Sequence, residues 1–188
     1  MAVQEPFASV LTAARIGAEW AITALYREFH PRLLRYLRAQ APTHGDDLAS
    51  EVWLDAAVAL PGFEGDATAF RRWLFTIAHR RLIDLRRADA RRRAFLTRLE
   101  SSQDSRAGAD PEASALAASE TEAALVRIGR LSPDQAQVVL LRVVAGLTVE
   151  EVSAVVGTKP GTVRVLQHRA LKRLAEEFAR EREAVVTQ

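Results

Sequence analysis

Apolar residues recur every three or four positions along three stretches in the first half of the chain. The first stretch covers about residues 18–40, and the second begins near Gly45 and stops at the Pro61-Gly62 pair. The third starts after Asp66 and continues into a run of arginines. This spacing places the apolar side chains on one face of an amphipathic α-helix. Because the stretches also contain large aromatic residues, we predict three helices that close one small core.

Start and stop signals mark three more helices near the C-terminus. Ser132-Pro133-Asp134-Gln135 combines an N-cap, a proline at the first helical position and a glutamine that reaches back to the cap. Gly146 can end this helix in a left-handed turn, and Thr148 then caps a short helix. Gly157 ends the short helix, and Thr158 is predicted to cap a longer and basic last helix.

The apolar pattern fades between the two groups of helices. The segment SSQDSRAGADPEASA cannot bury enough apolar surface to offset the entropy lost on ordering. We therefore predict an all-α fold of two small helical domains, over residues 18–93 and 119–180, joined by a flexible acidic linker over residues 94–118. The two domains are expected to move independently in the free protein.

Composition agrees with this fold, and it excludes disulfides, thiolate metal sites and a membrane-spanning helix. The 188 residues include 9 glycines, 7 prolines and few strand formers, so no sheet of consequence is expected. The chain has no cysteine, which excludes disulfides and thiolate metal sites within it and favours the cytoplasm. No run approaches the roughly 18 to 20 apolar residues of a spanning helix, and the N-terminus lacks a signal-peptide pattern. We expect no membrane insertion.

The distribution of charge indicates a nucleic-acid partner although the net charge is only +2. Nine arginines lie between Arg71 and Arg93 beside only two aspartates, and a second basic cluster spans residues 159–173. A run of like charges destabilises a helix unless counterions such as phosphates neutralise it. The segment between the clusters is acidic. This order of blocks is typical of two DNA-facing modules joined by a tether that DNA does not attract.

The last two predicted helices form the pattern of a DNA-binding helix-turn-helix, whose second helix enters the major groove. At about 100° per residue, the apolar positions of the last helix leave an outward face that is basic. Arg164 lies in the first turns, where an arginine can bond a guanine bidentately, whereas Arg169 and Lys172 suit phosphates. The alternative is a surface helix whose charges only face water, and the preceding helix and turn count against it.

Two features of the first domain have more than one interpretation. Phe70 and Trp73 fit a core better than a ligand site, because burial is the commonest use of aromatics at helical spacing. An acidic segment without lysine or arginine follows His44, and it holds Asp46, Asp47, Glu51 and Asp55. A DNA-binding module has reason to keep such a face away from DNA. The segment either serves a basic protein partner or is solvated surface.

These residues resemble the extracytoplasmic-function sigma factors of the sigma-70 family. Sigma region 2 usually has Asp-Leu followed by Gln-Glu-Val-Phe, and it is similar to DDLASEVWLDA, in which Ser50 replaces the Gln and Trp53 the Phe. Its Trp-Leu, Ile-Ala, Asp and Arg-Arg pattern resembles FRRWLFTIAHRRLIDLRR. Region 4 resembles almost all of LSPDQAQVVLLRVVAGLTVEEVSAVVGTKPGTVRVLQHRALKRL. The similarity covers roughly residues 20–92 and 125–176.

The resemblance implies a sigma factor, which binds core RNA polymerase and directs promoter-specific transcription initiation. The first domain would dock on the clamp helices of the β′ subunit through Asp47, Leu48, Glu51, Trp53 and Asp55. It would recognise and open the -10 element through Trp73, His79, Arg80, Arg81, Arg86 and Arg87. The second domain would sit on the β flap and read the -35 element through Lys159, Gly161, Thr162, Arg164, Val165, His168, Arg169 and Lys172. The resemblance also implies an anti-sigma factor as a partner.

One departure from the family concerns His79-Arg80, which stands where the family often has Arg-Asn and leaves the -10 base preference open.

The sequence does not support an enzyme, because the four histidines are scattered and neither a phosphate-binding loop nor metal-ligand spacing is present. No cofactor is expected. The alternative function is a two-domain helix-turn-helix regulator that binds duplex DNA without polymerase. A helical adaptor that binds only proteins is disfavoured by the basic last helix.

Overall fold

The computed structural model describes residues 6–100, 124 and 127–186. Over these residues the chain is helical and contains no strand, which confirms the predicted all-α fold. The helices of the N-terminal half are α1 (Phe7–Arg15), α2 (Glu19–Gln40), α3 (Gly45–Ala59), the short 3-10 helix η1 (Leu60–Gly62) and α4 (Ala67–Glu100). Those of the C-terminal half are α6 (Pro133–Val143), α7 (Val149–Val156) and α8 (Pro160–Val186).

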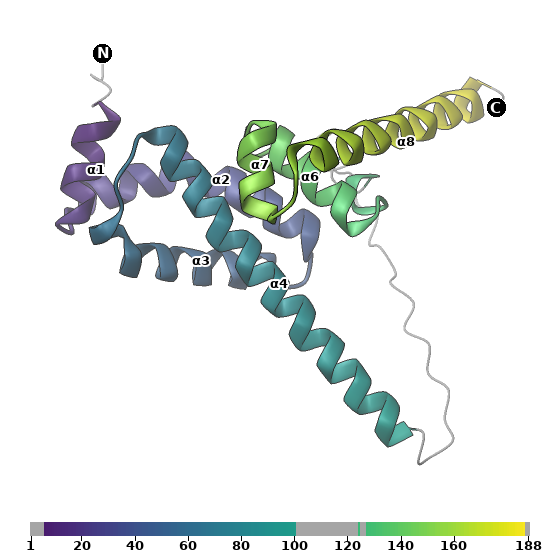
Figure 1. Cartoon of the computed structure of the whole chain (residues 1–188), viewed down its shortest axis with the longest axis horizontal. Coiled ribbons are helices and arrows are strands. Elements are labelled where there is room, and N and C mark those ends of the chain that lie inside the picture. The colour runs from purple at the N-terminus through teal and green to yellow at the C-terminus, as the bar shows by residue number, and fades with distance from the viewer. Residues whose placement is uncertain (1–5, 101–123, 125–126, 187–188) are drawn as a thin grey trace.

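The N-terminal domain packs α2, α3 and α4 around an aromatic core, and α1 lies at one end of it (Figure 1). Phe70 of α4 is buried, with its ring 4.9 Å from that of Phe29 and 5.5 Å from that of Phe63. Aromatic pairs at such distances each contribute roughly 0.5–1.5 kcal/mol beyond the burial of their area. Phe7 of α1 adds a fourth ring, with its centroid 5.9 Å from that of Phe70. This helix lies before residue 18, where the predicted domain began, so the prediction missed it.

The first turns of α3 and α4 are fixed by local chemistry. A Cβ atom at Gly45 would lie 2.7 Å from Cγ and 2.9 Å from Cα of Arg38, so only glycine lets α3 begin this close to α2. The predicted start of this helix is confirmed. At the start of α4, the carboxylate of Asp66 accepts a hydrogen bond from the backbone N–H of Ala69 at 2.7 Å. This bond satisfies one of the free N–H groups of the helix.

The C-terminal helices begin and end close to the predicted positions. Ser132 and Gln135 form the predicted capping box of α6, and Thr148 caps α7 as predicted. Gly146 and Gly157 have φ angles of 67° and 70°, the left-handed conformation that closes the turns after α6 and α7. These turns place α7 and α8 as a helix-turn-helix.

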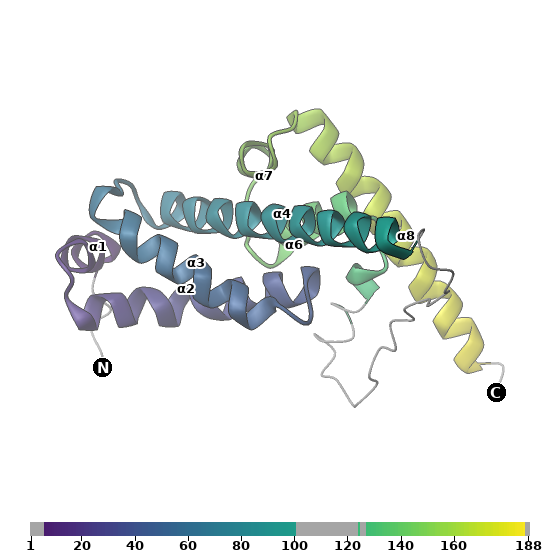
Figure 2. The ribbon, with the colours of Figure 1, turned by 90° about the horizontal axis from the view of Figure 1, so that it is seen from below.

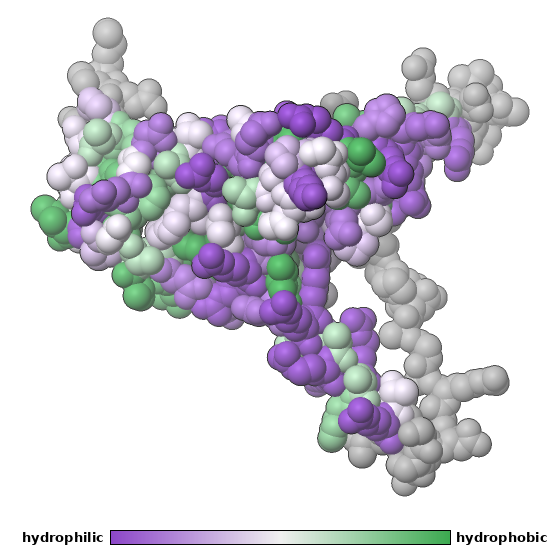
Figure 3. Space-filling view, in the orientation of Figure 1, coloured by the Kyte–Doolittle hydropathy of each residue, from purple (hydrophilic) through white to green (hydrophobic). Residues whose placement is uncertain are grey.

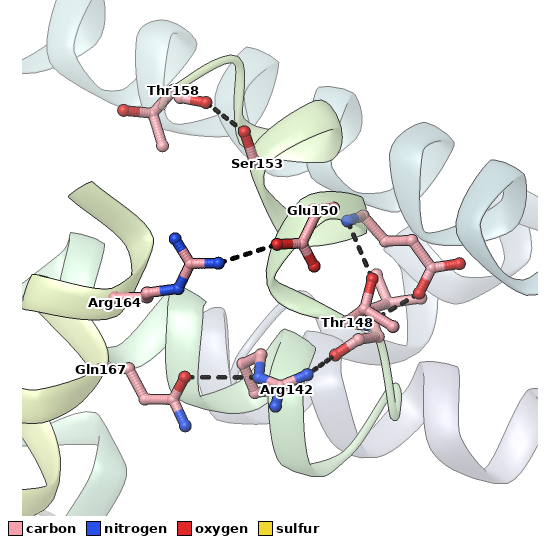
Figure 4. A network of polar contacts seen from close by, with 9 residues as sticks. Arg142, Thr148, Glu150, Ser153, Thr158, Arg164 and Gln167 are labelled. Carbon is pink, nitrogen blue, oxygen red and sulfur yellow. Dashed lines mark hydrogen bonds and ion pairs between the residues drawn. The ribbon is translucent and has the colours of Figure 1, made fainter. Parts of the chain in front are cut away.

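The cap predicted for the last helix is wrong by one residue. α8 begins at Pro160, so that the N-cap position falls on Lys159 and not on Thr158. Thr158 belongs to the turn instead, where its carbonyl oxygen accepts a hydrogen bond from the hydroxyl of Ser153 (Figure 4). Proline at the first helical position accounts for the start, because its missing N–H is not needed there.

α4 extends beyond the predicted end of the first domain at residue 93, and its last part projects away from the rest of the molecule (Figure 1). Residues 94–100 of the predicted linker continue this helix. Their sequence, AFLTRLE, contains no glycine or proline, so the loss of apolar periodicity does not mark a helix end here. Residues 101–118 of the predicted linker lie outside the described residues.

The two domains contact each other, with α6 against α2 and α7 against α4 (Figures 1 and 2). The side-chain amide of Gln137 on α6 donates to Nδ1 of His79 on α4, and these residues are only 6% and 7% exposed. Arg71 of α4 donates to the carbonyl oxygen of Gly146 at 3.4 Å. A buried polar pair favours one arrangement, because each partner would otherwise remain unsatisfied. The expectation of independently moving domains does not fit this packing.

Candidate nucleic-acid and polymerase interfaces

The residues predicted to read the -35 element lie on one exposed side of α8. Val163 and Ala170 are fully buried and orient the helix against the rest of the domain. Leu166 and Leu174 are half-buried beside them, as the periodicity predicted. The opposite side is exposed, and it brings together Gly161, Thr162, Arg164, Val165, His168, Arg169 and Lys172, while Lys159 is exposed just before the helix begins. Apart from Gly161 and the half-exposed Val165, these side chains carry hydrogen-bond donors or positive charge.

Arg164 is held in place by the preceding helix. Its guanidinium donates to the carboxylate of Glu150 on α7 at 2.9 Å, and both side chains are more than half exposed (Figure 4). An exposed pair of this kind contributes about 0–1 kcal/mol, because water competes with it. Glu150 therefore orients Arg164 without preventing it from binding another acceptor, such as a base edge.

Arg142 joins the three helices of this domain, and the sequence analysis did not single it out. From the last turn of α6 it donates to the carbonyl oxygen of Leu147, just before α7, and to Oε1 of Gln167 on α8 at 3.3 Å (Figure 4). Hydrogen bonds from a charged group contribute more than neutral ones, roughly 1.5–3 kcal/mol each. The network holds the helix-turn-helix as a rigid unit. The signal in the sequence was a lone arginine within the apolar run VVLLRVV.

The six residues predicted for the -10 element do not form one surface. Arg80 and Arg87 are exposed and seven positions apart on α4, so they share one side of the helix. Trp73 lies seven positions earlier but is half-buried, with its ring 4.9 Å from that of Phe63. Trp73 therefore belongs in part to the core, as spacing alone favoured. The remaining three predicted residues, His79, Arg81 and Arg86, point elsewhere.

His79 and Arg86 lie on the side of α4 that faces α2 and the C-terminal domain. His79 is buried against Gln137, and burial lowers its pKa, as do the nearby charges of Arg86 and Arg80. Arg86 donates to the side-chain oxygen of Gln40 on α2 at 2.6 Å. His79 is therefore not available to DNA while the domains stay in contact, and the guanidinium of Arg86 is engaged by α2.

Arg81 lies on the opposite side of α4 and fastens this helix to α3. Its guanidinium donates to both carboxylate oxygens of Asp55, at 2.6 and 2.5 Å, and lies 3.3 Å from Glu51. The hydrogen bonding that Arg81 donates and Asp55 accepts lowers the pKa of Asp55 and raises the pKa of Arg81. Arg81 and Asp55, predicted for DNA and polymerase respectively, thus satisfy each other within the domain.

The residues predicted for polymerase binding also separate into buried and exposed groups. Leu48 is buried, and Trp53 is half-buried and donates from Nε1 to Nδ1 of His30 at 3.2 Å. Asp47 and Glu51 are exposed. Residues that follow one another by 4, 7 and 11 positions lie on the same side of a helix. Counted from Asp47, these positions are Glu51, Leu54 and Val58. The prediction missed Leu54, which is 67% exposed, and Val58, which is 84% exposed.

We call the side of α3 with Asp47, Glu51, Leu54 and Val58 the docking stripe. The sequence could have indicated this surface, because it has a leucine and a valine on the side of the helix that otherwise carries polar, solvent-facing residues. Aliphatic residues beside carboxylates suit a protein partner better than DNA, because phosphates repel the acidic positions.

Within the described ranges there is neither a helix apolar and long enough to cross a membrane nor a group of three or more side chains placed to hold a metal ion.

Two family models match the chain, one for each domain. The model for Sigma-70 region 2 matches residues 25–92, and the model for Sigma-70, region 4, matches residues 121–174. The docking stripe and the predicted -10 residues fall within the first match, and α7 and the predicted -35 residues fall within the second.

Curated relatives match nearly the whole chain. The ECF RNA polymerase sigma factor SigD of Mycobacterium tuberculosis is 35% identical over 176 residues, which cover 90% of this chain and 82% of the relative. The ECF RNA polymerase sigma factor ShbA of Streptomyces griseus is 36% identical over 160 residues, or 80% of this chain and 83% of the relative.

Solved structures share the fold. CnrH in complex with the cytosolic domain of CnrY superposes with a TM-score of 0.63 at 21% identity, covering 93% of this chain and 98% of that chain. The sigma factor RpoE in complex with the anti-sigma factor NepR, from Bartonella quintana, gives 0.59 at 22% identity, over 82% and 94%. The resemblance seen in the sequence is confirmed: the chain belongs to the extracytoplasmic-function sigma factors of the sigma-70 family.

Proposed function

We propose a division of work among the surfaces of this sigma factor, which binds core RNA polymerase and directs promoter-specific initiation. The proposal depends on one observation: both sigma domains occur in one chain, and each carries an exposed surface whose chemistry suits a different partner. The acidic and apolar docking stripe suits a protein, and the basic side of α8 suits DNA.

The docking stripe is proposed to bind the clamp helices of the polymerase β′ subunit. Asp47 and Glu51 would face basic groups of the partner, and Leu54 and Val58 would lose their exposure to water. Full burial of an aliphatic side chain contributes roughly 1.5–3 kcal/mol, so these two residues would supply much of the affinity. Leu48 and Trp53 would act from inside, by holding α3 in place.

The exposed side of α8 is proposed to read the -35 element, with the C-terminal domain seated on the β flap. Arg164, in the second turn and already oriented by Glu150, would bond a base edge. Arg169 and Lys172 lie farther along the helix and would contact phosphates, which set the register but carry little sequence information.

The -10 element is proposed to be bound in two stages. Arg80 and Arg87 are exposed and would make the first phosphate contacts. His79 would follow only after the C-terminal domain leaves α4, because Gln137 covers it in the free protein, and Arg86 would first have to release Gln40. We infer that docking on polymerase separates the domains, since the -10 and -35 sites are separated along the promoter.

The remaining partners follow from the relatives. RpoE of Bartonella quintana is held by the anti-sigma factor NepR, and an anti-sigma factor is proposed for this chain as well. A sigma factor acts where its polymerase acts, which makes the bacterial cytoplasm the proposed location.

The test is a pull-down with core RNA polymerase, followed by transcription from promoter templates that carry different -10 and -35 sequences. The expected result is a stable complex with core polymerase and transcription that depends on both elements. Tight binding of promoter duplex by the chain alone, with no association with core polymerase, would instead favour the independent regulator.

A further inference from the structure

A groove of about 680 Å³ lies between α1, α2 and the start of α4. Sites that take small molecules typically have volumes of roughly 300–1,000 Å³. None of the surfaces assigned above includes this groove. In Figure 3, apolar surface lies beside hydrophilic surface at the end of the molecule that carries α1. The groove therefore has room for a small molecule with an apolar part and a polar part.

The groove is long and differs in character from one end to the other. Residues of α2 line it at intervals of four, in the order Trp20, Ala24, Glu28 and Arg32. Twelve residues separate the first from the last, which corresponds to about 18 Å along the helix. The first two are apolar and the last two are charged, so the groove has an apolar end and a charged end.

The apolar lining of the groove combines large rings with small side chains. Phe7 and Phe29 pack against each other with their ring centroids 6.4 Å apart. Trp20 is 54% exposed, although its large ring would be expected in the core. Ala24 and Ala67 line the groove as well and contribute only methyl groups, which leaves space between the rings. An alkyl chain in this space would be removed from water, which is favourable.

The charged end has two arginines against one carboxylate. Arg32 lies 3.9 Å from Glu28 and both side chains are exposed, so this ion pair is weak. Arg71 has a buried Nε without a hydrogen-bond partner. Its bond to the carbonyl oxygen of Gly146 is 3.4 Å long, which is near the limit for a hydrogen bond. Arg71 would therefore gain hydrogen bonds by turning toward an anion in the groove.

This arrangement fits a long-chain carboxylate. Its alkyl chain suits the apolar end, and its carboxylate can accept paired hydrogen bonds from an arginine. A small inorganic anion would leave the apolar end exposed to water. An uncharged apolar molecule, or an apolar helix of a protein partner, would leave the positive charge of both arginines uncompensated.

We propose that the groove binds a long-chain carboxylate, with the alkyl chain against Phe29 and Trp20 and the carboxylate on Arg32 and Arg71. This site goes beyond the proposed function, because neither polymerase nor DNA is needed to fill it. Nε of Arg71 is buried as the side chain stands, so the carboxylate reaches it only when the guanidinium turns into the groove. This turn breaks the bond to Gly146 in the C-terminal domain. Binding of the ligand therefore loosens the contact between the two domains.

Isothermal titration calorimetry of the complete chain tests the site with octanoate, decanoate and dodecanoate, each below its micelle concentration. One molecule should bind per chain. Each added CH₂ group that enters the groove should raise the affinity by up to about fourfold. 1-Octanol has the same chain as octanoate without the charge, and it should bind at least about tenfold more weakly. Butyrate has the charge without the long chain and should give no measurable binding.

Variants at the two ends of the groove should have different effects. Trp20→Ala should weaken the binding of dodecanoate by about tenfold and that of octanoate less, because only a longer chain reaches Trp20 from the arginines. Arg32→Gln with Arg71→Gln should remove the preference for octanoate over 1-octanol. The matched controls are Phe95→Ala and Arg27→Gln, which change an exposed aromatic residue and an exposed arginine outside the groove. Both controls should bind as the wild type does.

Energy transfer between dyes attached to α3 and α6 reports the contact between the domains. Saturating dodecanoate should lower the ratio of molecules with the domains in contact to molecules with separated domains by roughly two- to tenfold. This is the range expected when one hydrogen bond is lost. In Arg71→Gln the bond to Gly146 is already absent, so dodecanoate should leave its ratio unchanged.

Several results would overturn the proposal. The affinity of the wild-type chain could be independent of chain length, or 1-octanol could bind as tightly as octanoate; both tests hold even if a variant does not fold. Trp20→Ala could bind dodecanoate as tightly as Phe95→Ala does. Energy transfer that stays unchanged at saturating dodecanoate would refute the link to the domain contact. Binding to phosphatidylglycerol vesicles that Trp20→Ala abolishes would make the groove a membrane-docking surface instead. Polymerase binding is measured separately, so the proposed function stands or fails independently of these results.

Discussion

Replacing Gln137 by alanine should separate the two domains of the free protein. Gln137 and His79 are both more than nine-tenths buried where α6 meets α4, and they are joined by a hydrogen bond. Alanine removes the donor and leaves Nδ1 of His79 buried without a partner as long as the domains stay together. A buried acceptor without a hydrogen-bond partner would destabilise the contact between the domains by about 1–3 kcal/mol. We call molecules closed when their two domains are in contact. The ratio of closed molecules to molecules with separated domains should therefore fall by roughly 5- to 150-fold.

Single-molecule energy transfer can measure this ratio directly. The chain has no cysteine, so two introduced cysteines are the only sites of labelling. Val58 on α3 and Val143 on α6 are 84% and 68% exposed and lie in different domains, which makes them suitable positions. The doubly labelled protein should show mostly one high-transfer population, and the Gln137→Ala variant should show a larger low-transfer population.

The control is Asp134→Ala, which changes an exposed residue on the same helix and should leave the distribution of transfer efficiencies unchanged. A Gln137→Ala protein with a native circular-dichroism spectrum and an unchanged distribution would refute the reasoning, because the buried pair would then contribute nothing to closure. A wild-type protein that is already mostly separated would refute it as well.

Three further predictions concern pH, polymerase and promoter. Because burial lowers the pKa of His79 from its ordinary value of 6.5, the closed arrangement should be most populated above pH 6.5 and be lost as the pH falls below it. The same transfer measurement would detect this, and His79→Gln should abolish the dependence. Asp47→Arg with Glu51→Arg should abolish binding to core polymerase in a pull-down while circular dichroism stays native; retained affinity would make the docking stripe mere solvated surface. Arg164→Ala should reduce the free energy of discrimination at one -35 base pair by about 1–3 kcal/mol, whereas Lys172→Ala should weaken binding to all promoters evenly. Transcription from single-base promoter variants would separate the two, and identical profiles for both mutants would contradict the docking geometry.

The parts of the fold that depend on local chemistry were predictable from the sequence. The capping residues Ser132 and Thr148 act within one turn of the chain, and so does the left-handed glycine at position 157, so these signals needed no tertiary information. The outward side of α8 was predictable for a similar reason. Val163 and Ala170 face the core at helical spacing, and the remaining orientation follows from geometry.

The parts that depend on contacts between distant segments were not predictable. Spacing placed His79 and Arg81 in one basic run, but one is buried against Gln137, 58 positions away, and the other is paired with Asp55, 26 positions away. Only the packing of α4 between its neighbours decides which arginines remain exposed. Leu54 was missed although it is exposed, because a leucine in a helix is ordinarily assigned to the core.

The continuous helix α4 fixes the direction in which the chain leaves the N-terminal domain. The helix has 34 residues, so at about 1.5 Å per residue it is a rod of roughly 50 Å, and residues 91–98 are exposed along it. Because each residue turns a helix by about 100°, inserting one alanine after Arg93 would swing the direction in which the chain leaves Glu100 by that angle. Inserting seven would restore it to within about 20° while lengthening the rod by about 10 Å. Comparing the two insertions would separate the effect of direction from the effect of reach on how the second half of the protein finds its site.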